Sequence, residues 1–238
     1  MRNIFSIFKG DKNNLSTLSE SAKKNLDKGQ YNKAIDLYSE CLHLIDATPH
    51  FKDRDKSKAN MFSLLAFCFR KINDLDNALT SAMSACKFDP EDSSNYQLLG
   101  HIYMDKSDII NANEQFKVLL KKAPNNQEGL FFLGVTEGLL GNLNTAAKVF
   151  KELITFAPTD YEAHYNLGFT FQKQNRFQEA IDCYNITISL QPDYTDCLIN
   201  RGNCRIQLRQ KKQACIDFTR ALELGEERAQ ENINEHCT

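Results

Sequence analysis

The stretch YEAHYNLGFTFQKQNRFQEAIDCYNITISLQP, residues 161–192, contains the pattern that decides the fold. Its first half places Leu167 and Phe171 one helical turn apart, and its second half does the same with Phe177 and Ile181. Apolar residues at this spacing form one stripe along a helix. The polar run between the two stripes predicts a turn, so the stretch is expected to form two helices that pack against each other.

The same pattern recurs with a period of 34 residues over more than half the chain. Four kinds of position keep one phase: a glycine, an alanine, an aromatic residue and a proline. The series are Gly100, Gly134, Gly168 and Gly202; Ala78, Ala112, Ala146, Ala180 and Ala214; Phe116, Phe150, Tyr184 and Phe218; and Pro90, Pro124, Pro158 and Pro192. A fixed period of this length indicates stacked copies of one helical hairpin.

Small residues and turn residues within each repeat have physical roles in such a hairpin. Gly168 and Ala180 are small where the two helices approach closely. Glycine or asparagine occupies the expected interhelical turns, where a left-handed backbone is often needed; these residues are Gly29, Asn73, Gly141 and Asn175. Proline at the end of a repeat stops its second helix.

The order of these positions resembles the tetratricopeptide repeat, whose 34-residue pattern reads L-G-x₂-Y, then A-x₃-F, then P. Leu167, Gly168, Phe171, Ala180 and Tyr184 carry the resemblance in the stretch quoted above. The resemblance implies an all-α fold, a right-handed superhelical solenoid of antiparallel helix pairs. Ten glycines, five prolines and no tryptophan in 238 residues agree with a helical chain.

Six repeats and two terminal segments follow from this phase. Residues 1–14 are expected to form a loosely held N-terminal segment, and T-L-S-E at 17–20 is a candidate capping box for the first helix. Residues 47–58 are polar and are expected to form a longer loop or extended helix ends. Residues 226–238 are expected to form a capping helix with Ala229, Ile233 and Cys237 on one face, after the helix-terminating Gly225. The repeats span 15–48, 59–92, 93–126, 127–160, 161–194 and 195–225, so the array covers 15–225.

The sixth repeat is similar to a bacterial-type variant of the family. Its N-R-G and D-F residues include Arg201, where leucine is usual, and Asp217. We expect these two side chains to pair across the hairpin.

Composition excludes two classes of function. A net charge of −2 argues against binding nucleic acid through a basic field. No apolar run approaches the roughly 20 residues that a membrane span requires, and no secretory signal is recognised, so a cytoplasmic location is expected. The segment with Phe5 and Phe8 has three possible roles: it packs on the first helix, it frays, or it contacts a membrane surface.

The chemistry-bearing residues do not cluster in the sequence. Eight cysteines include no C-x-x-C pair, and they are expected to behave as small buried hydrophobic residues. The histidines are scattered, and His164 occupies a packing position. No catalytic residues, metal ligands or cofactors are expected, and the chain is predicted not to be an enzyme.

The resemblance implies a concave groove lined by the first helix of each repeat. Carried over position by position, it gives an apolar stretch with an acidic row, Glu128, Glu162 and Asp196, along one edge. Gly138 leaves a dip beside the adjacent Phe131 and Phe132. The predicted groove residues are Leu98, His101, Met104, Glu128, Phe131, Phe132, Val135, Leu139, Glu162, Tyr165, Asn166, Phe169, Asp196, Ile199 and Asn200.

An apolar groove of this size predicts a protein or peptide partner with apolar anchors and a basic residue or two. The function expected from the resemblance is that of a protein-interaction scaffold. A chaperone-like carrier of apolar segments and a self-associating structural protein are the alternatives, and self-coverage of the aromatic residues is a third. A carboxylate clamp of the chaperone-binding type is not expected, because Ser19, Lys23, Leu64, Ser94 and Leu98 occupy its positions.

Overall fold

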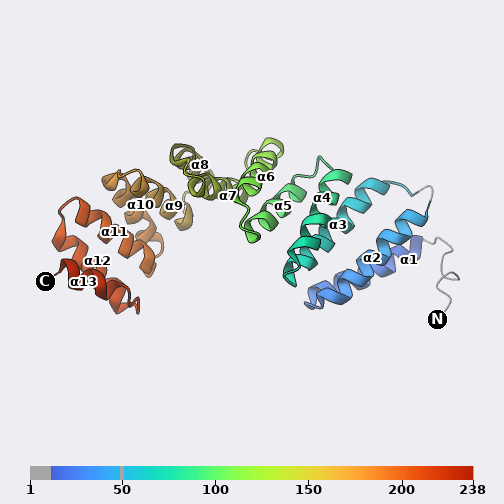
Figure 1. Cartoon of the computed structure of the whole chain (residues 1–238), viewed down its shortest axis with the longest axis horizontal. Coiled ribbons are helices and arrows are strands. Elements are labelled where there is room, and N and C mark those ends of the chain that lie inside the picture. Colours follow the sequence, from blue (N-terminus) through green and yellow to red (C-terminus); the bar gives the residue numbers. More distant parts are fainter. Residues whose placement is uncertain (1–11, 49–50, 238) are drawn as a thin grey trace. The chain divides into compact units, whose positions relative to one another are not determined.

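The computed structural model describes residues 12–48 and 51–237, which fold into thirteen α-helices without a β-strand (Figure 1). The predicted all-α class is confirmed. No helix in these two ranges is both long and apolar enough to cross a membrane. Phe5 and Phe8 lie outside the described residues. The helices are α1 (Lys12–Asp27), α2 (Tyr31–Ala47), α3 (Arg54–Lys71), α4 (Leu75–Phe88), α5 (Ser93–Asp105), α6 (Ile109–Lys122), α7 (Gln127–Leu139), α8 (Leu143–Phe156), α9 (Tyr161–Lys173), α10 (Phe177–Leu190), α11 (Thr195–Gln207), α12 (Lys211–Glu223) and α13 (Ala229–His236).

The chain divides into two compact units, Met1–Pro124 and Asn125–Thr238. Unit 1 contains α1 to α6, and unit 2 contains α7 to α13. Within each unit, consecutive helices pair and each pair packs on the next. In unit 2, one cluster of buried residues runs from α8 to α11, with Phe131 and Val135 of α7 packed against it. Each unit therefore has a hydrophobic core of its own.

The periodic glycines lie where the two helices of a pair touch. A Cβ atom built on Gly134 would come within 2.7 Å of the Phe150 ring, and Gly168 has the same relation to Tyr184 at 2.8 Å. These aromatic rings are almost completely buried, so they have little room to move. The expectation that glycine permits close approach is confirmed.

The four predicted turn residues all have a left-handed backbone, with φ of 70° at Gly29, 61° at Asn73, 80° at Gly141 and 59° at Asn175. Ser107 and Arg209 adopt the same conformation, with φ of 59° and 60°. They occupy the same place in their repeats, although their residue types gave no sign of it. Repeat phase therefore predicts this backbone better than residue type does.

The start of α1 differs from expectation, and the start of α3 decides between the two alternatives for residues 47–58. α1 begins at Lys12, so residues 17–20 lie inside the helix and are not its capping box. α3 begins at Arg54, which makes residues 54–58 an extended helix end. The Asp46 carboxylate on α2 fixes this end of α3, because it accepts a hydrogen bond from Arg54 at 2.8 Å and forms an ion pair with Lys58 at 2.7 Å.

The predicted pairing of Arg201 with Asp217 is confirmed between α11 and α12. Arg201 donates to the Asp217 carboxylate from Nε at 3.1 Å and from Nη2 at 2.6 Å. Arg205 also donates to the carboxylate, from Nη1 at 2.6 Å. This third member was not predicted, although it lies one turn after Arg201 on the same face of the helix.

The prediction that the cysteines are small buried hydrophobic residues needs one correction. Cys41, Cys68, Cys183, Cys197 and Cys204 are buried thiols, as expected. Cys215 and Cys237, however, form a disulfide between α12 and the residue that follows α13. The pairing depends on α13 folding back over α12, and a separation of 22 residues does not reveal this.

Candidate partner-binding surface

The predicted groove residues lie on the first helix of each pair. In unit 1, α5 carries Leu98, His101 and Met104. In unit 2, α9 contacts both α7 and α11, so three first helices lie side by side. These three helices carry the other predicted residues, which are Glu128, Phe131, Phe132, Val135 and Leu139 on α7, Glu162, Tyr165, Asn166 and Phe169 on α9, and Asp196, Ile199 and Asn200 on α11.

The three residues of α5 are half-buried. Leu98 packs against the core cluster that includes Ala66 and Ile102. The His101 ring meets the Phe116 ring edge-on, with centroids 5.7 Å apart. This part of the surface is therefore partly engaged in holding unit 1 together.

The adjacent Phe131 and Phe132 cover each other in part. Their rings meet edge-on with centroids 5.3 Å apart, and Phe131 meets the buried Phe150 in the same way at 6.3 Å. Both remain half-buried rather than fully covered. Phe131 is thus a link between the exposed surface of α7 and the core of unit 2.

A cavity of about 560 Å³ opens between α7, the start of α8 and α9. Phe169, 38% exposed, stands on one side, and Leu139, 61% exposed, stands on the other. Gly138 contributes no side chain, and a Cβ atom there would meet only Ala146 at 4.0 Å. The full lining is Gly134, Val135, Gly138, Leu139, Gly141, Leu143, Phe150, Asn166, Phe169, Thr170 and Lys173.

Four of these lining residues belong to the predicted set, namely Val135, Leu139, Asn166 and Phe169. Lys173 also lines the cavity, and its Nζ lies 5.0 Å from the centroid of the Phe169 ring. Asn166 donates from Nδ2 to the backbone oxygen of Glu162 at 2.8 Å. The cavity therefore has mainly apolar walls, with one amide and one cation at its edge.

Tyr165 is the centre of an aromatic cluster between α9 and α11. Its ring centroid lies 4.8 Å from that of Tyr194 and 6.5 Å from that of Phe169. Asn200 donates to the Tyr165 hydroxyl at 2.9 Å. Burial, followed by the charge of Asp196, raises the pKa of Tyr165 to about 12. The hydroxyl is therefore neutral at physiological pH and acts as a hydrogen-bonding group.

Two side chains of the acidic row accept hydrogen bonds from other residues of the chain. Asp196 accepts from Arg228, just before α13, at 2.7 Å. Glu162 on α9 is exposed and accepts from the Tyr161 hydroxyl at 3.4 Å. Glu128 begins the row on α7 and is exposed.

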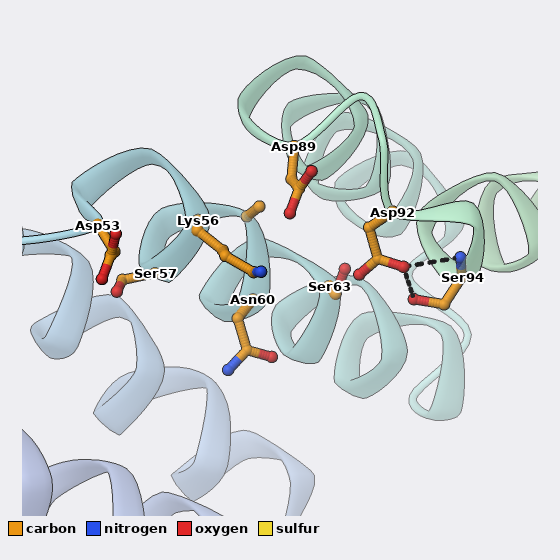
Figure 2. Close-up of a pocket in the computed structure, with 9 residues that line it drawn as sticks. Asp53, Lys56, Ser57, Asn60, Ser63, Asp89, Asp92 and Ser94 are labelled. Carbon is orange, nitrogen blue, oxygen red and sulfur yellow. Dashed lines mark hydrogen bonds between the residues drawn. The ribbon is translucent and has the colours of Figure 1, made fainter. Parts of the chain in front are cut away.

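Unit 1 contains a polar cavity of about 490 Å³ where the start of α3 approaches the turn between α4 and α5. Figure 2 shows Asp53, Lys56 and Asp89 around it. Asp92 accepts from the backbone nitrogen of Ser94 at 2.9 Å and from its hydroxyl at 2.7 Å, which caps the start of α5. The Asp92 side chain therefore serves the start of α5.

Within residues 12–48 and 51–237, no group of three or more His, Cys, Asp or Glu side chains is placed to hold a metal ion. His164 is buried, and its Nε2 lies 3.0 Å from the backbone oxygen of Pro158. It therefore has a packing role, as expected.

Comparison with known proteins agrees with this architecture. The tetratricopeptide-repeat family model matches residues 161–194, which contain the stretch 161–192 that decides the fold. No curated protein matches the chain.

Several solved structures have the same fold. MamA shares 22% identity and a TM-score of 0.68 over 73% of this chain and 94% of its own. MamA from Desulfovibrio magneticus RS-1 shares 20% identity and a TM-score of 0.68, over 71% and 95%. YrrB, described as a tetratricopeptide-repeat protein with an unusual peptide-binding site, shares 18% identity and a TM-score of 0.69, over 80% and 96%. The family model thus matches one repeat of this chain, and the likeness to MamA and YrrB shows a shared fold of stacked helical hairpins.

Proposed function

We propose that the chain is a non-catalytic interaction protein, and that an apolar side chain of its partner inserts between α7 and α9. The cavity bounded by Leu139 and Phe169 is the observation that carries this proposal. Burying an apolar side chain contributes about 1.5–3 kcal/mol, so covering these two residues and the partner's anchor gives useful binding energy. The peptide-binding site named for the structurally similar YrrB supports the same class of ligand.

The partner's chemistry follows from the groups around the cavity. Its anchor is a leucine- to phenylalanine-sized side chain, because the walls are apolar and the volume of about 560 Å³ is typical of ligand pockets. A basic residue flanking the anchor meets the exposed Glu162 carboxylate. Such a contact at the rim adds orientation and salt sensitivity, while the anchor supplies most of the affinity.

Peptide display tests the proposal and defines the preferred anchor in the same experiment. A random-peptide library is selected on the full chain, and the tightest peptide is labelled for fluorescence polarisation. We expect Leu139→Ala and Phe169→Ala each to raise Kd by about tenfold, the loss of about 1.4 kcal/mol of apolar contact. Circular dichroism of each variant checks that it is folded.

Ile110→Ala is the matched control. Ile110 on α6 is 67% exposed, close to the 61% of Leu139, but lies outside the cavity. Its substitution is expected to leave Kd unchanged. Folded Leu139→Ala and Phe169→Ala variants that bind as tightly as the wild type contradict the proposal.

The two alternatives from the sequence predict different results. A self-associating protein has a mass that rises with concentration and falls after Leu139→Ala. A carrier of apolar segments selects peptides without a shared anchor. A selection that converges on one spaced apolar motif supports the proposed function over both.

A further inference from the structure

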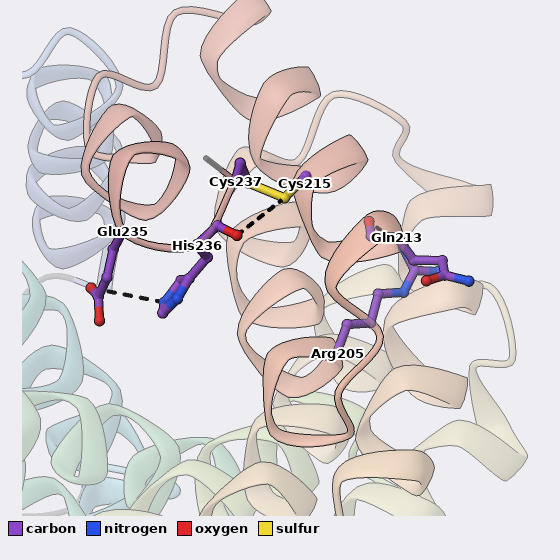
Figure 3. Close-up of a disulfide and its surroundings, with 6 residues drawn as sticks. All are labelled: Arg205, Gln213, Cys215, Glu235, His236 and Cys237. Atoms are coloured by element: carbon purple, nitrogen blue, oxygen red, sulfur yellow. Dashed lines mark hydrogen bonds and ion pairs between the residues drawn. A yellow bond between two sulfur atoms is a disulfide. The ribbon is translucent and has the colours of Figure 1, made fainter.

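The disulfide between Cys215 and Cys237 lies at the edge of a cavity in unit 2. Figure 3 shows it joining α12 to the end of α13, with the backbone oxygen of His236 beside it at 3.9 Å from Cys215 Sγ. Both cysteines are half-buried, and both line a cavity of about 710 Å³. The sulfur atoms are therefore within reach of a small molecule.

Cationic side chains line the same cavity. Arg209, Lys211 and Lys212 contribute to its walls together with two glutamines. Lys211 and Lys212 precede Cys215 by four and three residues on α12, so they share its helix face. None of the described residues that line this cavity is acidic. The site favours negative charge, both on an approaching molecule and on the Cys215 sulfur.

The other thiols of the described chain differ in access and in protonation. Five are buried, and Cys86 is half-buried. Burial raises the pKa of Cys41 and Cys86 to about 11 and that of Cys197 and Cys204 to about 12. At neutral pH these groups remain protonated and react slowly. The Cys215–Cys237 pair is thus the sulfur site with both access and a cationic environment.

The disulfide also holds a helix that is too short to be stable alone. α13 has eight residues, well below the length at which an isolated helix persists in water. The buried residue of α13 is Ala229, in its first turn. Near the end of α13, the His236 ring stacks on the Phe218 ring with centroids 6.3 Å apart. The covalent bond is the strongest attachment of its C-terminal end.

We propose that Cys215–Cys237 is an exchangeable disulfide, that its cavity admits an anionic low-molecular-weight thiol, and that exchange releases the end of α13 from α12. The thiolate attacks Cys237 Sγ and forms a mixed disulfide there. The Cys215–Cys237 bond breaks, and Cys215 leaves with the electron pair as a thiolate beside Lys211 and Lys212. Cys215 is the leaving group because Lys211 and Lys212 lie on its helix face and stabilise the negative charge that its sulfur acquires.

A second thiolate completes the reaction. It attacks the small molecule's sulfur in the mixed disulfide, which forms the oxidised dimer of the small thiol and frees Cys237 as a thiolate. Two electrons pass to the protein disulfide, two small thiols are oxidised to one disulfide, and each protein thiolate takes up a proton from water. This exchange reaction does not depend on the proposed peptide-binding function.

Exchange kinetics on the full, oxidised chain test the proposal. Glutathione serves as the anionic thiol and 2-mercaptoethylamine as the cationic one, and intact-protein mass spectrometry follows the mixed disulfide. We expect glutathione, compared per thiolate, to react about tenfold faster, and this advantage to disappear at high salt. Peptide mapping should place the first adduct on Cys237.

A charge-reversal variant and its control isolate the role of the cationic cavity. Lys211→Glu/Lys212→Glu should slow glutathione by about tenfold and speed up 2-mercaptoethylamine. Lys23→Glu/Lys24→Glu on α1 changes the net charge equally and should leave both rates unchanged. Equal effects of the two variants, or a first adduct on Cys215, overturn the proposal.

Hydrogen exchange reports on the release of α13. In the reduced chain and in Cys237→Ser, amides of residues 229–237 should exchange about tenfold faster or more, while α11 stays protected. Unchanged protection of α13 after reduction overturns the proposed release. A bond that exchanges only in denaturant, or that fails to form in an oxidising glutathione buffer, overturns the proposal as a whole.

Discussion

Gly134 and Gly138 lie one helical turn apart on α7, yet the same substitution should have opposite effects at the two positions. A methyl group on Gly134 would press on the buried Phe150 ring, because its Cβ atom comes within 2.7 Å. Overpacking of this kind costs about 1–3 kcal/mol. At Gly138 the nearest atom is 4.0 Å away, so alanine there should stabilise the helix by up to about 1 kcal/mol.

Thermal unfolding followed by circular dichroism checks this pair. We expect Gly134→Ala to lower the unfolding midpoint of the full chain and Gly138→Ala to raise it. The two variants control for each other, since both add one methyl group to the same helix. A shift in the same direction for both contradicts the assigned roles, in which Gly134 permits packing and Gly138 opens the cavity.

Asp217 is a buried carboxylate that links α12 to α11. Its carboxylate, 1% exposed, accepts hydrogen bonds from Arg201 and Arg205. Asp217→Ala leaves two half-buried guanidinium groups without their carboxylate and should cost about 3 kcal/mol. Arg201→Ala leaves Arg205 to bond the carboxylate and should cost about 1–2 kcal/mol.

Hydrogen exchange of the α11 and α12 amides measures these costs locally in the full chain. The exposed ion pair of Lys106 with Asp76 in unit 1 is a suitable control, because water screens exposed pairs of this kind and they add little to stability. An Arg201→Ala variant that loses as much protection as Asp217→Ala contradicts the shared role of the two arginines.

The pairing of helices within each hairpin was predictable from the sequence, whereas details at the chain's ends were not. The 34-residue phase fixes contacts such as Gly134 with Phe150, because every copy repeats the same geometry. The start of α1 and the Cys215–Cys237 bond involve the first and last described helices, where the 34-residue pattern is weaker or absent. Rules for stacked repeats describe contacts between copies of the repeat, so they do not fix where α1 begins or how α13 is attached.

The repeat pattern also predicts the candidate site only in part, at the scale of the whole molecule. Repeat phase predicts that Val135, Leu139 and Phe169 share one face, but it describes all first helices alike. The cavity occurs at one place along unit 2, where Gly138 lacks a side chain and Phe169 and Lys173 stand opposite. The depth of the cavity depends on the sizes of individual side chains in neighbouring repeats. The repeat pattern describes what the copies share, so it does not predict these sizes.

Unit 2 should fold without unit 1. The core cluster that spans α8 to α11, with Phe131 and Val135 of α7 against it, consists entirely of residues after Pro124. A repeat array gains stability from contacts between neighbouring repeats, and these contacts within unit 2 remain complete in a fragment of residues 125–238. The cavity between α7 and α9 is also contained in this fragment.

We therefore expect fragment 125–238 to be helical, to unfold cooperatively, and to bind the selected peptide with the Kd of the full chain. Fragment 161–238 is the matched control, because it lacks α7 and α8, divides the cluster and loses seven of the eleven residues that line the cavity. It should unfold at a lower midpoint and should not bind the peptide. If fragment 125–238 is helical but binds more weakly than the full chain, the partner also contacts unit 1; if it fails to unfold cooperatively, the core of unit 2 is not sufficient by itself.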